Sequence, residues 1–569
     1  MEYNLIAPIE LPLIQQIFKN RGMNPEDVEK YLRPNESMVH DFFLLDNIKK
    51  GARMLATHLA AEDDTLLIVD CDADGFTSAA VLANYLERFA PHFVSNHLNY
   101  YFHAGKQHGL VDCVEEAKKY KFIIAPDSSS NDYEQHKELK DLGIDILVLD
   151  HHEADYVSSD ACVINNQFGD YPNRTLSGVG VVYKFCKYLD MLLGENYADD
   201  YLDLVAVGMV GDMIDLRPLE TRYFIATGLE NPRNPFVKGM MEKNNFKIQG
   251  ELSPFKISFY VAPFINATIR SGGPEDKRML FTAMLESKAE ELVDSTKRGC
   301  FGQQETIIEQ VCRNCGNIKN RQDKMADEGL ALLENIIEEK NLLSKKLLII
   351  TLDEITLDKN IVGLMANKLM GKYKRPVAVL NKTENGWAGS ARGYEKSQLK
   401  DFKEFVVASN LTSLAQGHAN AFGIEIPFEN FDKFIEYTEE ALKDMEFTTI
   451  YSVDYINPNS SDILEIADYK SIWGQNIEEP LVVFEKVKIY KDNIHLLKQN
   501  TLKINLPDSD IEFIKFGSSE NEFNSLYSEN GYVMVNIIGN CSVNEWGGMM
   551  TPQIQIKDYE IVDSVKYFF

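Results

Sequence analysis

Short apolar runs that end in acidic residues recur in the first part of the chain. Three runs and the residues that follow them are Thr65–Val69 with Asp70, Phe122–Ala125 with Asp127, and Ile144–Leu149 with Asp150. Runs of this length are typical of buried strands in a parallel sheet, and helical patterns such as Thr77–Phe89 lie between them. A fourth run, Leu204–Val210, precedes Asp212 and is a candidate for a further strand. The pattern predicts an α/β fold.

The rest of the chain divides by pattern into further domains. Residues 1–45 form an N-terminal helical appendage, residues 46–225 the first α/β domain, and residues 226–345 a helical connector. Residues 346–445 form a second α/β domain, and residues 446–569 an antiparallel β domain that we expect to be a small barrel. The strands expected in the last domain include Leu481–Ile489, His495–Ile504 and Tyr532–Ile538.

Acidic side chains gather where the predicted parallel strands end. In a parallel sheet the carboxyl ends of the strands meet at one edge, so these side chains are expected to converge. The candidates are Asp70, Asp72, Asp74, Asp127, Asp150 and Asp212, with His151 and His152 beside them. Such a cluster needs raised pKa values or bound cations. Two divalent ions can stabilise the attacking and leaving oxygens of a phosphoryl displacement, and the imidazoles favour Mn²⁺, with Mg²⁺ as the other possibility.

Each part of this cluster also has a purely structural explanation. The segment from Asp70 to Gly75 resembles the opening of a calcium-binding EF-hand loop, but Val81 stands where that loop needs Glu. Asp127 could cap a helix, Asp212 could lie in a turn, and the residues after Asp150 could form a capping turn. The coincidence of four acidic strand ends in one sheet favours a shared site and phosphoester hydrolysis.

Composition narrows the classes of partner. There are 58 Lys and Arg against 87 Asp and Glu, a net charge of −29, which argues against coating nucleic acid or an anionic membrane through bulk charge. Eight scattered cysteines do not form a disulfide framework. With no secretory leader or apolar span in evidence, we expect a cytoplasmic protein without membrane contact, and a monomer.

The motifs together resemble a known family. Val69 to Gly75, Asp127, Asp150-His151-His152 and Gly211-Asp212 resemble the four motifs of the DHH phosphoesterase superfamily. Further segments resemble the RecJ-like single-stranded-DNA-specific exonucleases: Leu176–Gly180, Ala262–Ala267, Gly363–Asn367, Gly389–Arg392, Gly417-His418, Trp473–Asn476 and Asn544–Gly547. The resemblance covers residues 45 to 569. It implies a DHH catalytic domain, a DHH-associated domain that binds substrate, and a C-terminal OB-like barrel.

The resemblance implies a role for each matching residue. Asp70, Asp72, Asp74, Asp127, His151 and Asp212 would be ligands of two metal ions or lie just behind them, with Asp74 and Asp127 shared. His152 would contact the scissile phosphate, and Asp150 would orient a neighbouring His. Ser390 and Arg392 would bind a 5′-phosphate. The other substrate-binding candidates are Arg270, Asn266, His103, Lys106, Gly417 and His418.

Some positions depart from the family pattern. Val69 stands where members usually carry Gly, and His103 stands where they carry an Arg that contacts the terminal phosphate. Phe264 replaces another Arg, and Gln416 replaces a Gly. Fewer cations predict looser DNA binding than is usual in the family.

The function implied is a metal-dependent 5′→3′ exonuclease on single-stranded DNA that releases 5′-mononucleotides during DNA repair, recombination or replication. A single-strand-binding protein or a helicase would be its possible protein partner. Two alternatives stay open at this point: a phosphodiesterase for short oligonucleotides or cyclic dinucleotides, and a non-catalytic replication scaffold.

Overall fold

The computed structural model describes residues 1–105, 107–248, 250–353, 355–506 and 509–566. The chain separates into two units. The first unit comprises residues 21–319 and 469–479, and the second comprises residues 1–20, 320–468 and 480–569. The boundary at residue 319 falls inside the long helix α16 (Ile307–Glu339). Each unit is described by itself.

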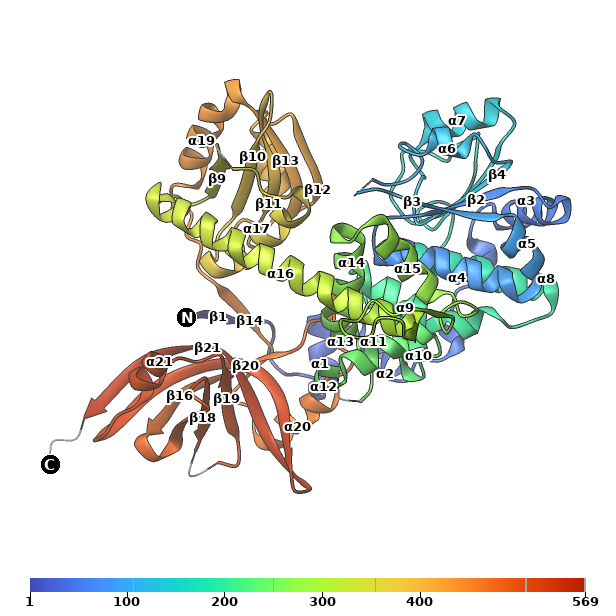
Figure 1. The fold of residues 1–569 in the computed structure, drawn as a ribbon. Helices are drawn as coiled ribbons and strands as arrows, with labels where there is room; N and C mark the ends of the chain where they lie inside the picture. Colours follow the sequence, from blue (N-terminus) through green and yellow to red (C-terminus); the bar gives the residue numbers. More distant parts are fainter. Residues whose placement is uncertain (106, 249, 354, 507–508, 567–569) are drawn as a thin grey trace. The chain divides into compact units, whose positions relative to one another are not determined.

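The first unit is built on a five-stranded parallel sheet, of which β2, β3 and β4 are labelled in Figure 1. Its order is β3 (Leu98–Phe102), β2 (Thr65–Val69), β4 (Phe122–Pro126), β5 (Asp145–Asp150) and β6 (Cys162–Asn165). The strands predicted before Asp70, Asp127 and Asp150 are confirmed. Alternate residues face opposite sides, so that Leu66 and Ile123 enter one apolar core while Leu147 packs towards α3 (Ile48–Ala61). The other helices here are α4 (Ala73–Phe89), α5 (Pro91–Asn96), α6 (Val114–Ala117), α7 (Tyr133–Asp141) and α8 (Gly178–Leu193).

The predicted strand at Leu204–Val210 is wrong, because this segment lies in the helix α9 (Leu202–Gly211). Every residue from Leu202 to Val210 is buried, and all of them except Asp203 are apolar. An uninterrupted apolar run cannot distinguish a buried helix from a buried strand by periodicity. Asp212 therefore follows a helix, not a strand.

Helices and one hairpin complete the first unit. The helices are α2 (Pro25–Leu32), α10 (Leu219–Glu230), α11 (Pro235–Lys243), α12 (Asn245–Ile248), α13 (Pro254–Tyr260), α14 (Ala262–Ser271) and α15 (Pro274–Met284). Short 3-10 turns lie at η1 (Glu36–Met38), η2 (Phe42–Leu44) and η3 (Ala198–Tyr201). The expectation of a helical connector did not include the antiparallel hairpin of β7 (Leu292–Asp294) and β8 (Gln304–Thr306).

The second unit contains another five-stranded sheet, in the order β12 (Leu414–His418), β13 (Ala421–Pro427), β11 (Gly386–Arg392), β10 (Val377–Lys382) and β9 (Leu348–Leu352). Strands β9 and β10 are parallel and the other pairs are antiparallel. Separate apolar cores cover its two faces. The surrounding helices are η4 (Leu342–Ser344), α17 (Lys359–Tyr373), α18 (Phe402–Ala408) and α19 (Phe428–Leu442).

The C-terminal sheet has seven strands, in the order β15-β16-β20-β21-β19-β18-β17. Their bounds are β15 (Tyr455–Ile456), β16 (Leu481–Tyr490), β17 (Ile494–Leu497), β18 (Thr501–Asn505), β19 (Glu512–Phe516), β20 (Gly531–Trp546) and β21 (Met549–Lys566). The expectation of a purely antiparallel domain is corrected, because β15 pairs with β16, and β19 with β21, in parallel. The segment from His495 to Ile504 is two strands joined by a turn. Helices α20 (Ser460–Asp468) and α21 (Glu520–Leu526) and the turn η5 (Lys491–Asn493) accompany the sheet.

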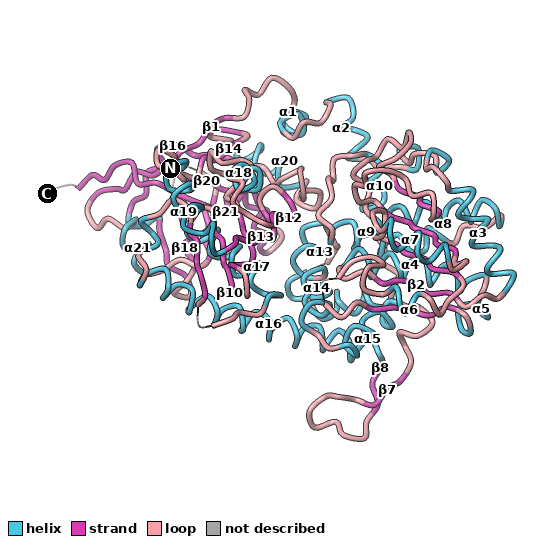
Figure 2. The backbone as a smooth tube through the Cα atoms, turned by 90° about the horizontal axis from the view of Figure 1, so that it is seen from above, coloured by secondary structure: helices cyan, strands magenta, loops and turns pink. Residues whose placement is uncertain are grey.

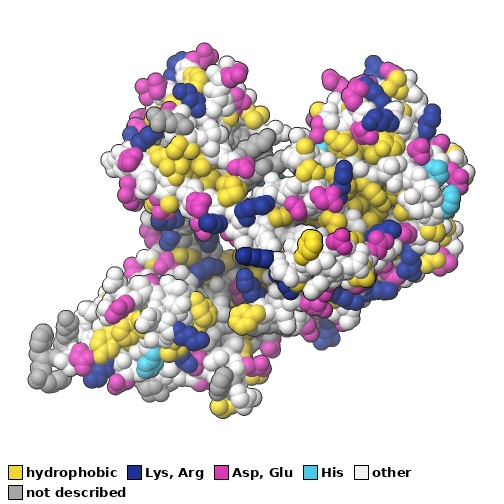
Figure 3. Space-filling model, viewed as in Figure 1, with side chains coloured by type: hydrophobic (Ala, Val, Ile, Leu, Met, Phe, Trp, Pro, Cys, Tyr) yellow, Lys and Arg dark blue, Asp and Glu magenta, His cyan; other side chains and the backbone are white. Residues whose placement is uncertain are grey.

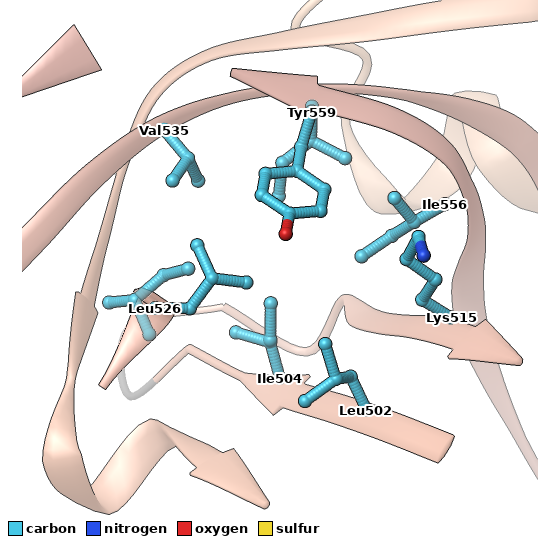
Figure 4. A pocket seen from close by; sticks show the side chains of 9 residues that line it. Leu502, Ile504, Lys515, Leu526, Val535, Ile556 and Tyr559 are labelled. Carbon is cyan, nitrogen blue, oxygen red and sulfur yellow. The ribbon is translucent and has the colours of Figure 1, made fainter. Parts of the chain in front are cut away.

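Apolar side chains of the C-terminal sheet pack together into a core. Side chains including Leu502, Ile504, Val535 and Ile556 meet around the ring of Tyr559 (Figure 4). The space among them does not admit a water molecule. This part of the domain therefore provides stability and no ligand cavity.

The N-terminal residues belong partly to each unit. The predicted helices are present as α1 (Leu13–Asn20) and α2, but the strand β1 (Glu2–Leu5) was not predicted. It pairs in parallel with β14 (Ile450–Val453), with Glu2 opposite Ile450. Among the described residues, no helix is long and apolar enough to cross a bilayer.

Candidate active site

The turn between β2 and α4 carries the first three acidic residues. Asp72 caps α4 by accepting a hydrogen bond from the backbone N–H of Gly75 at 3.0 Å. A Cβ atom on Gly75 would lie 2.5 Å from Cβ of Asp70, so this close approach requires glycine. Asn266 accepts a hydrogen bond from the N–H of Ala73 at 3.1 Å and thereby fixes the start of the helix.

The N-terminus of α8 holds the carboxylate of Asp74. The N–H groups of Gly178 and Val179 donate to its two oxygens at 2.7 and 3.2 Å, and the Ser177 hydroxyl donates at 3.2 Å. A helix N-terminus stabilises negative charge at such a position. A Cβ on Gly178 would lie 2.2 Å from Oδ1 of Asp127, so glycine is what lets α8 approach both carboxylates.

Asp127 follows β4 in a left-handed backbone conformation, with φ at 60°. Its N–H donates to the carbonyl of Leu149 at 2.8 Å, which keeps the residue against the end of β5. The side chain is buried, yet Oδ1 has no hydrogen-bond partner among the residues that the structure describes. Nε2 of His151 lies 3.3 Å from this oxygen.

Asp150 organises the two histidines that follow it. Its Oδ1 accepts hydrogen bonds from the N–H of His151 at 2.7 Å and from Nδ1 of His152 at 2.8 Å, and Oδ2 accepts from the N–H of Ser130 at 3.0 Å. Burial alone would raise the pKa of Asp150, but the hydrogen bond and charge of His152 hold that pKa below its usual range. The buried carboxylate therefore fixes the orientation of the His152 ring.

The predicted acidic and imidazole groups do converge. Asp212, at the end of α9, places Oδ2 3.7 Å from Nε2 of His151. The ligand atoms lie within 4.8 Å of one another in each of three sets: Asp74, His151 and Asp212; Asp70, Asp72 and Asp127; and Asp127, Asp150, His151 and His152. Segments from residue 70 to residue 212 thus supply one cluster.

Burial and mutual repulsion raise the pKa values of Asp72, Asp127 and Asp212. Burial raises the pKa of Asp127 well above the usual value, with further increases from the charges of Asp74 and Asp72. The same causes, burial first, raise the pKa of Asp212 to about 8. Burial also lowers the pKa of His151 to about 4, so this ring is neutral at physiological pH and its free nitrogen can bind a metal ion.

These donors fit a divalent cation. Two ligand atoms bound at right angles to one small cation at about 2.1 Å lie about 3 Å apart. The 3.3 Å between Oδ1 of Asp127 and Nε2 of His151 is close to that value, and no hydrogen bond from another described residue reaches the Asp127 oxygen. A cation would satisfy both atoms and offset the crowded negative charge.

Comparison with known proteins identifies the family. A model of the DHH family, N-terminal domain, matches residues 64–209, one of the DHHA1 domain matches residues 344–444, and one of the RecJ OB domain matches residues 451–558. YorK of Bacillus subtilis (strain 168), named as a prophage-derived single-strand DNA-specific exonuclease, is 37% identical over 580 residues, covering 99% of this chain and 98% of YorK. The chain belongs to the RecJ family.

More distant RecJ proteins match along nearly the whole chain. RecJ of Bacillus subtilis (strain 168) is 24% identical over 575 residues, covering 96% of this chain and 68% of that protein. The crystal structure of Thermus thermophilus RecJ in complex with Mn²⁺ superposes with a TM-score of 0.73 at 17% identity, covering 99% of this chain and 80% of that one. This likeness confirms the predicted fold class.

One histidine of the cluster was missed in the sequence. Nδ1 of His108 lies 2.7 Å from Oδ2 of Asp70, and its ring contacts that of His152. Burial opposes protonation, but the hydrogen bond and charge of Asp70 raise the pKa of His108 overall. The only signal in the sequence was position, because His108 lies five residues after His103, which aligned with the RecJ family's arginine.

The remaining candidates of the first unit differ in exposure. His103 is fully buried, with Nδ1 3.0 Å from Asp112 and Nε2 3.8 Å from Asp70, so it lies behind the cluster and not at the surface where substrate contact was expected. Asn266 is engaged with Ala73, while Arg270 is exposed and its charge acts on Asp72. Lys106 lies outside the described residues.

The second unit gathers Ser390, Arg392, Gly417 and His418 on one sheet. Ser390 and Arg392 are two residues apart on β11 and therefore share a face. A Cβ on Gly363 of α17 would lie 2.7 Å from Nη2 of Arg392 and 3.4 Å from Oγ of Ser390, so the helix leaves these groups space. Ala421 of β13 pairs with both Arg392 and His418, which places the two in one row across the sheet.

Proposed function

We propose that this chain is a metal-dependent exonuclease that hydrolyses single-stranded DNA from the 5′ end and releases 5′-mononucleotides. The observation that carries the proposal is the buried Oδ1 of Asp127, which has no hydrogen-bond partner among the described residues and lies in a cluster of other carboxylates. The names of its relatives, single-strand DNA-specific exonucleases, support the substrate class.

The cluster would hold two divalent ions, with Mn²⁺ favoured and Mg²⁺ as a possible substitute. Asp74, His151 and Asp212 would surround one ion and Asp70, Asp72 and Asp127 the other, with Asp127 close to both sets. When bound, such ions activate water and stabilise the charge that develops on the phosphoryl oxygens. Structures of Thermus thermophilus RecJ in complex with Mn²⁺ and with Mg²⁺ support the binding of divalent ions.

His152 would neutralise charge on the scissile phosphate. The hydrogen bond and charge of Asp150 raise the pKa of His152 to about 9 against the lowering effect of burial, so the ring is protonated at neutral pH. Its side chain is 44% exposed, which leaves it accessible to substrate. Asp150 keeps Nδ1 occupied at 2.8 Å and so directs Nε2–H outward. Charge-assisted donors of this kind stabilise a phosphoryl transition state.

The second unit would recognise the end of the strand. Arg392 and Ser390 on β11 combine a planar guanidinium with a hydroxyl, which suits a terminal phosphate with two or three oxygens free. Gly417 and His418 lie on the same sheet and would extend this contact. Recognition of a 5′-phosphate would give the enzyme its direction.

Local positive charge would have to attract the substrate, because the chain as a whole carries −29. Figure 3 shows basic and acidic side chains interspersed on the face in view. We therefore expect binding to depend on a few cations and to weaken steeply with salt.

The test is a time course on single-stranded DNA labelled at either end, with Mn²⁺, with Mg²⁺ and with chelator. A 5′ label should appear at once as a mononucleotide, while a 3′-labelled strand should shorten progressively, and chelator should stop both. Asp127→Asn should lose all turnover, whereas Asp141→Asn, at an exposed position of α7, should match the wild type.

Three results would contradict the proposal. These are activity of Asp127→Asn, activity in chelator, and release of the 3′ label first. Rapid cleavage of a dinucleotide without attack on long strands would instead favour a phosphodiesterase for short oligonucleotides.

A further inference from the structure

The hairpin of β7 and β8 is anchored at its base by α16. Arg313 of α16 makes a two-pronged ion pair with Glu305 of β8, with Nη2 2.7 Å from Oε1. The same guanidinium donates to Oγ1 of Thr296 at 2.8 Å, and Gln310 donates to the carbonyl of Asp294 at 3.0 Å. Both strands of the hairpin are therefore attached to one long helix.

The tip of the hairpin consists of two successive β-turns. The N–H of Cys300 donates to the carbonyl of Lys297, and the N–H of Gln303 donates to the carbonyl of Cys300, both at 3.0 Å. Gly299 and Gly302 occupy the third positions of these turns, with φ at 84° and 78°. A type II turn requires such φ values at that position, and glycine adopts them without strain. The tip is thus a defined structure specified by Lys297 to Gln303.

This construction presents two corner side chains to solvent. Arg298 and Phe301 occupy the second positions of the two turns, and Lys297 precedes them. The Phe301 side chain is completely exposed, and both cations are exposed as well. Figure 2 shows the β7–β8 loop projecting from the neighbouring helices. The hairpin is held in place by α16, and its tip exposes the Phe301 ring and the cations of Lys297 and Arg298 to solvent. These side chains therefore form a surface to which a ligand can bind.

We propose that this tip binds single-stranded DNA outside the active site, with a base stacked on Phe301 and a phosphate paired with Arg298. The inference rests on the proposed function for its choice of DNA. Every base offers a π-face to an exposed aromatic ring, and a guanidinium three residues away suits the adjoining phosphate. Local positive charge in a strongly acidic chain also matches a polyanion. The tip would help to retain long strands and would add nothing for very short ones.

The test measures binding of fluorescent oligothymidylate in chelator, so that no strand is cut. Phe301→Ala should weaken binding of a long strand about tenfold, and Arg298→Gln should weaken it while reducing the salt slope by about 0.7. Phe246→Ala is the matched control, because this ring is also largely exposed in the first unit but lies on α12. It should leave binding unchanged.

A direct signal comes from Phe301→Trp. Stacking of a base should quench the fluorescence of the tryptophan added at position 301. The wild type, with its three natural tryptophans, gives the background signal. The inference is overturned if Phe301→Ala and Arg298→Gln bind like the wild type, or if Phe301→Trp shows no quenching on a strand that binds. Turnover of a dinucleotide by Phe301→Ala should equal that of the wild type. An absence of turnover in every form, with the binding differences retained, would count against the proposed exonuclease and not against the tip.

Discussion

The rings of His108 and His152 meet edge to face, with centroids 4.7 Å apart and planes inclined at 71°. Each ring has Nδ1 tied to a buried carboxylate, His108 to Asp70 at 2.7 Å and His152 to Asp150 at 2.8 Å. The two Asp–His pairs come from different loops at the ends of the strands. They leave two imidazoles side by side at the edge of the carboxylate cluster.

His108 should therefore assist His152. We expect His108→Phe to lower kcat on single-stranded DNA about tenfold, because the ring contact is kept while the charge-assisted donor is lost. The measurement is steady-state hydrolysis with Mn²⁺, with kcat and KM determined separately. His92→Phe, at a side chain that is 71% exposed and belongs to none of the three carboxylate sets, is the control and should be neutral. Equal kcat for His108→Phe and the wild type would remove His108 from the active site.

Stability without metal should fall as pH rises. The folded-state pKa of Asp212 is about 8, above its unfolded value of about 3.9, so this group favours folding below pH 4 and loses that contribution as pH rises towards 8. In chelator, the melting temperature of Asp212→Asn minus that of the wild type should increase by about 3 °C from pH 4 to pH 8. Mn²⁺ should raise the wild-type melting temperature at pH 8 and raise that of the variant less.

Two results would contradict this prediction for Asp212. If the melting temperatures of the wild type and Asp212→Asn change in parallel with pH in chelator, the pKa of the Asp212 carboxyl is not raised in the folded protein. If Mn²⁺ stabilises both equally, Asp212 is not a ligand.

The space beside Gly363 should decide how the 5′ end is recognised. Gly363→Ala would push a methyl group to within 2.7 Å of Nη2 of Arg392, which must then move. We expect at least a fivefold loss in kcat/KM on 5′-phosphorylated strands, similar in kind to Arg392→Gln, with little change on 5′-hydroxyl strands. Gly371→Ala lies on the same helix with open space around it and should be neutral. Equal losses on both kinds of end would show that Arg392 does not read the phosphate.

The sequence predicted the cluster because its spacing follows a simple rule. Strand ends of a parallel sheet meet, so the pattern of apolar runs was enough to place Asp70, Asp127 and Asp150 together. The rule failed for Asp212, whose preceding segment is a helix, although the residue still joins the cluster. The sequence could not show which of His103 and His108 is exposed beside the cluster, because their burial depends on how the loop between β3 and α6 folds over Asp70.

Long-range pairings were also beyond the sequence pattern. Three of the four residues of β1 are exposed, and the segment is too short for its alternation of polar and apolar residues to have indicated a partner. That partner is β14, and the pairing depends on contacts hundreds of residues away.

The pairing of β1 with β14 also sets an order of events during synthesis. Residues 21–319 leave the ribosome as a nearly complete group, and only residues 469–479 are added to it later. Glu2–Leu5 is made long before Ile450–Val453 and must wait for that segment before it gains its hydrogen-bonded neighbour. In a nascent chain that ends between those points, the carboxylate cluster could form while Glu2–Leu5 still lacked its partner strand.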